Sequence, residues 1–125
     1  MRYTYEINPE GETINVVTIG HLETKELADL GLKILLKAKE LKYRIIFDCR
    51  QSRNKITIAE AYYWYATHYD HIDIVLRNIP IAYIVNKEDW NFYSFFECTC
   101  MNQGIQIKVF QEEADGLNWI EKFKR

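Results

Sequence analysis

Hydrophobic and polar residues alternate at the start of the chain in the pattern of a half-buried β-strand. Tyr3, Tyr5 and Ile7 would share one face of this strand, and polar residues occupy the positions between them. Residues 8–11, Asn-Pro-Glu-Gly, have the composition of a turn, and residues 14–19 are more continuously apolar. The pattern therefore predicts an antiparallel β-hairpin at the N-terminus.

The rest of the chain alternates between helical spacing and short apolar runs. We expect helices over residues 23–42, 57–69, 88–102 and 112–123, and further strands over 43–48, 79–85 and 105–109. This order predicts an α/β fold in which the hairpin leads into successive βα units. Its sheet should have five strands, mostly parallel, with about four helices packed on it. The first and fifth strands alternate most regularly, which places them at the sheet edges.

The chain has 125 residues, which predicts a single domain over residues 1–125 that needs no disulfide or metal to fold. Its net charge of −2 argues against a nucleic-acid-binding protein. The sequence has no apolar run long enough to span a bilayer, and no signal-peptide segment at its start. Its three cysteines suggest no disulfide framework, so we expect a cytoplasmic protein with reduced thiols.

Three stretches resemble STAS domains, and in particular the small bacterial SpoIIAA-like proteins. They are the hairpin start, residues 44–48 (Arg-Ile-Ile-Phe-Asp), and the tail 109–114 (Val-Phe-Gln-Glu-Glu-Ala) with Trp119 and Ile120. The tail is similar to the SpoIIAA-like group related to Sec14 domains, and the resemblance covers nearly the whole chain. It implies a SpoIIAA-like fold and a non-enzymatic domain that binds proteins or small ligands without a cofactor.

Thr57 is the nearest equivalent of the serine that is phosphorylated in the anti-sigma-factor antagonists of this family. Its neighbours Ile56 and Ile58 do not match their Asp-Ser-Ser-Gly motif. Residues 57–60, Thr-Ile-Ala-Glu, match a capping box instead. In a capping box the Thr hydroxyl accepts from a first-turn N–H and the Glu reaches back to the Thr amide. We favour capping as the role of Thr57, and leave phosphorylation of Thr57 or Ser52 open.

A polar loop is predicted over residues 49–55, between the third strand and the second helix. It contains Arg50, Arg53 and Lys55, with the hydroxyl of Ser52 among them. The loop leads into a helix N-terminus at the carboxyl end of a parallel sheet, a position that favours anions and ligands. It is therefore a candidate binding edge for an anion or a partner. The alternative, which we favour, is a solvated connection.

Aromatic residues make up 14% of the chain and concentrate in the second and third predicted helices. On the second helix, Trp64 should lie on the flank and Tyr63 near the outer side, and the residues that should face the core are Ile58, Ala61, Tyr62, Tyr65 and Tyr69. The first helix also has Leu32 and Leu36 off its main apolar face. Such residues are covered by a neighbouring helix, or they form an interface or an apolar pocket; the pattern does not decide between these.

The sequence offers little catalytic chemistry. The pairs His68 and His71, and Cys98 and Cys100, match no zinc signature. The chain contains no nucleophile elbow, phosphate loop, dinucleotide fingerprint or kinase motif, and no partner is evident for Asp48 at the end of the third strand. We therefore expect no catalytic residue and no metal site.

These observations together predict a non-enzymatic, STAS-like interaction or regulatory module that binds a protein partner or a second copy of itself. The alternative is a carrier or sensor of a small apolar or anionic ligand in a pocket between the aromatic-rich helices. An exposed aromatic surface would favour the first, and an enclosed pocket the second. The candidate binding residues are Arg50, Ser52, Arg53, Lys55, Thr57, Tyr63 and Trp64.

Overall fold

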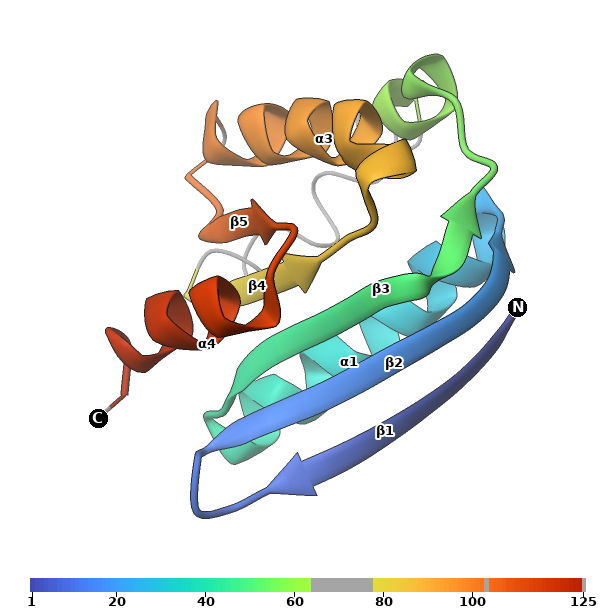
Figure 1. Ribbon diagram of the computed structural model, residues 1–125. Helices are drawn as coiled ribbons and strands as arrows, with labels where there is room; N and C mark the ends of the chain where they lie inside the picture. Colours follow the sequence, from blue (N-terminus) through green and yellow to red (C-terminus); the bar gives the residue numbers. More distant parts are fainter. Residues whose placement is uncertain (64–77, 103, 125) are drawn as a thin grey trace.

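The computed structural model describes residues 1–63, 78–102 and 104–124, which form a layered α/β structure (Figure 1). The strands are β1 (Arg2–Asn8), β2 (Thr13–Leu22), β3 (Arg44–Asn54), β4 (Ile81–Ile84) and β5 (Ile107–Phe110). The helices are α1 (Thr24–Leu41), α3 (Trp90–Asn102) and α4 (Glu113–Glu121), with a short 3₁₀ helix, η1 (Lys87–Asp89), before α3. Residues 58–63, which follow β3, are also helical. None of the described helices is long and apolar enough to cross a membrane.

The sheet of the described residues has five strands in the order β1-β2-β3-β4-β5. The pair β1–β2 is antiparallel, and every later pair is parallel. This arrangement confirms the predicted hairpin, the βα units and the placement of the first and fifth strands at the edges.

Helix α1 forms because its apolar residues recur on one face. Leu30, Ile34 and Ala38 are buried against the sheet, each four residues from the next. The helix ends at Lys42, whose backbone is left-handed, with φ 62°, and whose N–H donates to the carbonyl of Ala38. This turn directs the chain back into β3.

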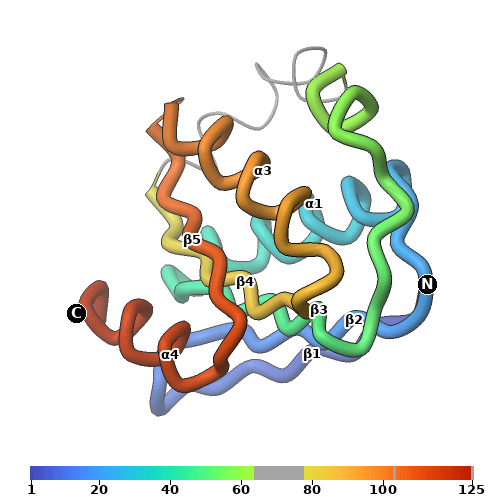
Figure 2. Tube along the Cα trace, turned by 45° about the horizontal axis from the view of Figure 1, so that its top comes forward, coloured from blue at the N-terminus to red at the C-terminus, as the bar shows by residue number. Residues whose placement is uncertain are grey.

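The helices lie on both faces of the sheet (Figure 2). Strand β4 shows the division, because its side chains alternate between the two faces. Ile81 and Tyr83 pack in the core beneath α1 and α3, whereas Ala82 and Ile84 pack against Ile120 of α4. Since β4 is covered on both faces, all four of its residues are buried, and each large apolar side chain contributes roughly 1.5–3 kcal/mol.

The predicted loop over residues 49–55 is wrong, because β3 continues through Asn54. Gln51 to Asn54 pair with Ile19 to Leu22 of β2, beyond the end of β4. A bulge precedes this extension, where Cys49 and Arg50 lie opposite Thr18. The segment resembles a loop in sequence because, with only β2 beside it in the described sheet, most of its side chains face solvent.

Candidate functional site

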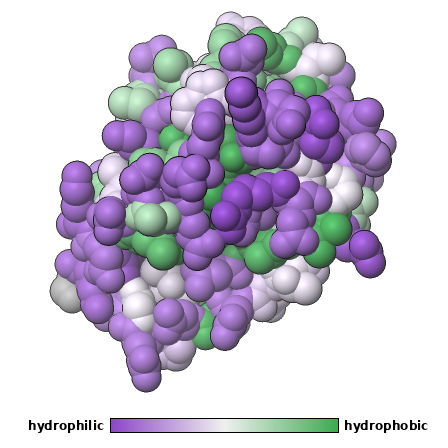
Figure 3. Space-filling view, viewed as in Figure 1, coloured by the Kyte–Doolittle hydropathy of each residue, from purple (hydrophilic) through white to green (hydrophobic). Residues whose placement is uncertain are grey.

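Arg50 lies at the carboxyl end of the sheet, where β3 extends beyond β4. Its Nε donates to Asp48 Oδ1 at 2.9 Å, and its Nη2 donates to Asp48 Oδ2 at 2.7 Å. The same Nη2 donates to Oε2 of Glu113, at the start of α4, at 2.8 Å. Arg50 therefore links β3 to α4 through two carboxylates. In the view of Figure 3, hydrophilic side chains cover much of the surface, with apolar patches between them.

The charges of this group shift each other's pKa values. Partial burial alone would raise the pKa of Asp48, but hydrogen bonds and the positive charge of Arg50 outweigh burial and lower that pKa. The pKa of Arg50 is raised, chiefly by its hydrogen bond to Asp48. Because the Arg50 side chain is 40% exposed, solvent screening limits the contribution of the pair to no more than about 1 kcal/mol.

A second set of contacts holds the end of β3 against the segment after β4. Arg53 Nε lies 3.6 Å from Oδ1 of Asp89, which is 8% exposed. The other carboxylate oxygen of Asp89 accepts from the backbone N–H of Asn54 at 2.9 Å. Asn86 Nδ2 donates to the carbonyl of Ser52 at 2.7 Å. Both arginines at this end of the sheet therefore have carboxylate partners.

Ser52 is 2% exposed. Its hydroxyl shares a 2.9 Å hydrogen bond with the Thr18 hydroxyl of β2 and donates to the carbonyl of Cys49 at 3.0 Å. These bonds hold β3 against β2 at the bulge. Ser52 thus supports the strand pair from within and does not present its hydroxyl to solvent, unlike the binding role that the sequence suggested.

Thr57 caps the helix over residues 58–63, as predicted. Its Oγ1 accepts from the backbone N–H of Glu60 at 3.1 Å. The carboxylate of Glu60 accepts from the hydroxyl of Thr57 at 3.2 Å and from that of Thr24 at 3.0 Å, and not from the Thr57 amide. Glu60 therefore ties the beginning of this helix to the start of α1.

Two residues at the beginning of this helix are more exposed than the apolar pattern predicted. Ile58 and Tyr62, which were expected to face the core, are 44% and 62% exposed. Tyr63 is 74% exposed, on the outer side as expected. Helical periodicity identifies residues that share a face, but it does not say whether another element covers that face, and here Ile58 and Tyr62 are exposed while Ala61 is half-buried.

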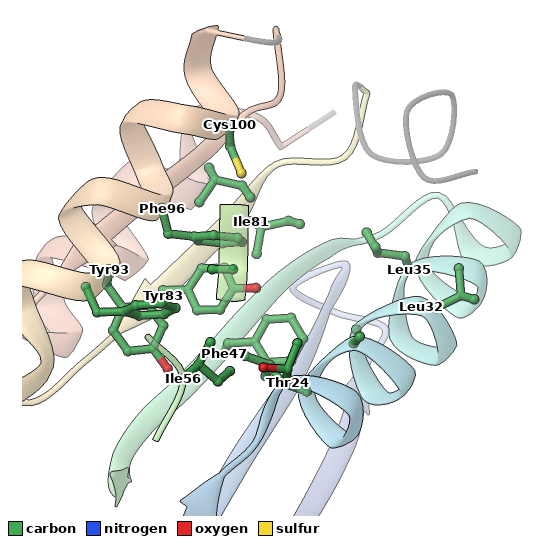
Figure 4. Close-up of a pocket in the computed structure, with 16 residues that line it drawn as sticks. Thr24, Leu32, Leu35, Phe47, Ile56, Ile81, Tyr83, Tyr93, Phe96 and Cys100 are labelled. Atoms are coloured by element: carbon green, nitrogen blue, oxygen red, sulfur yellow. The ribbon is translucent and has the colours of Figure 1, made fainter. Parts of the chain in front are cut away.

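A cavity of about 110 Å³ lies between α1 and α3, against the sheet (Figure 4). We call it the α1–α3 cavity. A Cβ added at Gly31, on the α1 wall, would meet no atom within 4 Å. The walls are almost entirely apolar and include Leu27, Leu35, Phe47, Ile81, Phe92 and Phe96.

Tyr83 brings a polar group to this cavity. Its ring stacks on Phe47, with centroids 5.0 Å apart, and meets the ring of Phe96 edge-on at 5.8 Å. Its hydroxyl points into the space between α3 and α1 (Figure 4) and has no hydrogen-bond partner among the described residues. Burial raises the pKa of Tyr83 well above its ordinary value, so the hydroxyl stays protonated and can donate or accept a hydrogen bond.

The buried thiols beneath α3 are not activated. Burial raises the pKa of Cys49 to about 11 and that of Cys100 to about 12. Both are therefore neutral near pH 7, which argues against thiolate chemistry at these positions. No group of three or more His, Cys, Asp or Glu residues in the described ranges could hold a metal ion.

Comparison with solved structures finds an uncharacterised protein of the DUF3478 family, with a SpoIIAA-like fold, from Shewanella loihica PV-4. The match covers 94% of this chain and 93% of that protein, with a TM-score of 0.59 and 12% sequence identity. This chain has a SpoIIAA-like fold. No protein-family model matches its sequence, and no curated protein does.

The SpoIIAA-like fold brings Arg50, Arg53 and Lys55 to one end of the sheet. The side chain of Lys55 is exposed, but an anion approaching the two arginines would meet the carboxylates that already bind them. The anion site that the sequence predicted here therefore stays a prediction, and an anion would have to compete with these carboxylates for the two arginines. The predictions for Trp64, Tyr65, His68, Tyr69 and His71 lie outside the described residues.

The sequence suggested an apolar pocket between the aromatic-rich helices, but it did not place a cavity between α1 and α3 in this SpoIIAA-like domain. Two signals were present. Gly31 lies inside a predicted helix, where a glycine costs about 1 kcal/mol relative to alanine and therefore calls for an explanation. Tyr83 places a hydroxyl in an otherwise apolar strand. Asp89 and Glu113 were also missed as partners of the arginines, because contacts across 36 and 63 residues leave no local pattern.

Proposed function

We propose that this SpoIIAA-like chain is a non-enzymatic, STAS-like module that binds a protein partner through residues 57–63, which we call the 57–63 surface. The observation that carries the proposal is the exposure of Tyr62, 62%, next to Ile58, 44%, and Tyr63, 74%. Aromatic side chains are enriched at the centres of protein interfaces, where they account for much of the binding energy.

The position of this surface within the fold supports the proposal. It begins at Thr57, the nearest equivalent of the phosphorylated serine in the antagonists that the sequence resembles. It also lies beside the polar end of β3, where Arg53 and Lys55 are exposed. An apolar centre with a polar rim is the usual composition of a protein interface.

The experiment compares the native chain with Tyr62→Ser, and with Leu36→Ser as a matched control. Leu36 is 52% exposed on α1, away from the 57–63 surface. Each protein is immobilised and exposed to lysate of the source organism, and retained proteins are quantified by mass spectrometry. We expect a protein that the native chain and Leu36→Ser retain equally and that Tyr62→Ser loses at least about tenfold. Its affinity is then confirmed with purified components.

Identical sets of retained proteins for all three chains would contradict the 57–63 surface. Sedimentation velocity of the native chain and Tyr62→Ser tests whether a second copy is the partner. In that case the native chain should dimerise at tens of micromolar, and the variant should remain monomeric.

The α1–α3 cavity favours a second candidate function, the binding of a small apolar ligand that carries one hydrogen-bonding group. The observation behind this candidate is the Tyr83 hydroxyl, which lacks a partner among the described residues and points into an apolar space. The cavity volume, about 110 Å³, is somewhat smaller than an engineered cavity of about 150 Å³ that binds benzene. A ligand of a few carbon atoms, or the end of a longer chain, matches this size.

Gly31 provides the test of this candidate. Gly31→Leu would fill the cavity from the α1 side, whereas Gly31→Ala adds one methyl group and serves as the control. n-Hexanol is titrated into each protein, and the methyl NMR signals of Ile81 and Leu35 are followed. We expect saturable shifts in the native chain and in Gly31→Ala, and none in Gly31→Leu. Saturable shifts in all three proteins, or in none, would rule the cavity out as a ligand site.

A further inference from the structure

A second hollow lies at the opposite end of the sheet, where the parallel strands begin. We call it the amino-end cleft, and its volume is about 300 Å³. Lys39 and Lys42, from the end of α1, and Arg44, from the start of β3, line it. Its apolar wall includes Tyr43, Pro80 and Phe123.

Arg44 is 5% exposed, yet it has no carboxylate partner among the described residues. Its Nη1 donates to the carbonyl of Ile120 at 2.6 Å, its Nε donates to that of Glu12 at 3.4 Å, and its Nη2 donates to that of Gly11. These carbonyl dipoles, one of them at the C-terminal end of α4, compensate part of the positive charge. A guanidinium has five N–H groups, so two remain for another acceptor.

Lys39 and Lys42 add positive charge to the same cleft. Both are exposed, and neither forms an ion pair within the described part of the chain. Glu12 contributes the one carboxylate among the lining residues, and it lies beyond ion-pairing distance of the three cations. The cations therefore outnumber the carboxylate, and the cleft has a positive field.

The backbone at the cleft departs from what these residues ordinarily adopt. Glu12 and Lys42 have φ values of 55° and 62°, the positive-φ positions of the described residues at which the side chain is not glycine. Glycine is the usual residue at such a helix end. Lysine at position 42 also suits the negative end of the α1 dipole, but this accounts for neither the second strained residue nor the buried Arg44.

We propose that the amino-end cleft binds a small phosphate ester. The phosphate accepts hydrogen bonds from the remaining N–H groups of Arg44 and from the ammonium groups of Lys39 and Lys42. The organic part packs on Tyr43, Pro80 and Phe123. Arginine and lysine are the side chains that bind phosphate oxygens most effectively, and a buried cation without a counter-charge gains most from an anionic ligand. This site lies at the other end of the sheet from the 57–63 surface and is independent of it.

The first measurement is an NMR titration of the native chain with phenyl phosphate and with inorganic phosphate, at constant low ionic strength. Amide signals of residues 39–44, Glu12 and Gln106 should shift and saturate. Phenyl phosphate should bind at least about threefold more tightly, because its ring buries apolar surface that inorganic phosphate lacks. Shifts spread evenly over the protein would overturn the site, and equal affinities for the two compounds would overturn the role of the apolar wall.

The variant that separates binding from folding is Lys42→Gly, because glycine suits the left-handed backbone while removing the charge. The dissociation constant for phenyl phosphate should rise about tenfold, as expected for the loss of one charge-assisted hydrogen bond. Lys55→Gln, at the opposite end of the sheet, is the matched control and should bind as the native chain does. If Lys55→Gln weakens binding as much as Lys42→Gly, the ligand is recognised by overall charge and the cleft is overturned as the site.

Discussion

Arginines lie at both ends of the parallel sheet, but their hydrogen-bond partners differ between the two ends. At the carboxyl end, Arg50 and Arg53 are partly exposed and meet carboxylates, from Asp48 on the same strand and from the distant Glu113 and Asp89. At the amino end, Arg44 is buried and donates to backbone carbonyls, and the lysines beside it form no ion pair in the described ranges.

This difference indicates that the contacts of Arg44 at the amino end stabilise the fold, whereas the arginine contacts at the carboxyl end can change more easily. Exposed ion pairs contribute roughly 0–1 kcal/mol each, so the contacts of Arg50 with Asp48 and Glu113 can rearrange at little cost. Arg44 joins the hairpin turn to the last turn of α4, and its loss would remove a charged donor from the carbonyls of Gly11 and Ile120. The same residue type therefore anchors the fold at one end and remains adaptable at the other.

The largest effect that the comparison predicts is the loss of Arg44. Arg44→Ala should lower the free energy of unfolding by about 3 kcal/mol, because three carbonyls lose a charged donor in a buried place. Arg50→Ala should cost less than about 1 kcal/mol. Urea denaturation of both variants measures the difference.

Arg44→Lys is the control for charge alone. The ammonium group of a lysine lacks the planar fork of a guanidinium and cannot reach all three carbonyls, so this variant should recover only part of the lost stability. Equal losses for Arg44→Ala and Arg50→Ala would mean that the two ends do not differ in the way described.

The sequence predicted the fold well because the fold depends on periodicity. The continuous apolar run around Ile81 correctly indicates a strand covered on both faces. The alternation of Tyr3, Tyr5 and Ile7 predicted the first strand but not its burial, because Tyr3 and Tyr5 are 36% and 42% exposed. The anchoring role of Arg44 was not predictable. Its partners Gly11 and Ile120 are 33 and 76 residues away, and nothing near Arg44 in the sequence points to them.

The candidate sites were predicted less well, and the reasons are also physical. Local composition placed Ser52 in a solvated loop, but its hydroxyl is satisfied by Thr18 across the strand pair. Thr57 was predicted correctly as a cap because capping involves residues three apart, within reach of sequence reasoning. The exposure of Tyr62 depends on whether another element covers that side of the helix, and the periodicity of the sequence carries no information about this.

The cap at the carboxyl end gives the next largest expected effect. Thr57→Ala removes the acceptor for the Glu60 N–H and the donor to the Glu60 carboxylate, and should cost about 1 kcal/mol. Thr57→Ser keeps both bonds and should lie within about 0.3 kcal/mol of the native chain. Urea titrations of the two variants, with helicity followed by circular dichroism, check this. An alanine variant as stable as the serine variant would remove capping as the role of Thr57.

A smaller effect, of opposite sign, is expected at the amino end. Lys42→Gly should raise the free energy of unfolding by about 0.5 kcal/mol, because glycine adopts the left-handed backbone without strain. Lys39→Gly, at an ordinary helical position three residues earlier, should lower it by about 0.5–1 kcal/mol. Thermal unfolding of the two variants measures both changes. A loss of stability in both would show that no relievable strain is present at Lys42.

The smallest expected effect concerns pH and distinguishes the two ends chemically. The pKa of Asp48 is lowered in the folded protein, so its carboxylate stabilises the fold at pH values above its unfolded pKa of 3.8. That contribution should be lost as the pH falls through 3.8 toward the lower folded value. Because Arg50 is 40% exposed and solvent screens the pair, the total should stay below about 1 kcal/mol. Arg44 binds carbonyls, which do not titrate, so its contribution should not change over this range.

The measurement is urea denaturation of the native chain and Asp48→Asn from pH 7 to pH 3, repeated in the Arg50→Ala background. The native chain should exceed Asp48→Asn in stability at pH 7, the gap should narrow as the pH falls below 3.8, and it should be nearly absent throughout in the Arg50→Ala background. A gap that does not change with pH, or that survives the loss of Arg50, would show that Asp48 acts through its neutral hydrogen bonds and not through its charge.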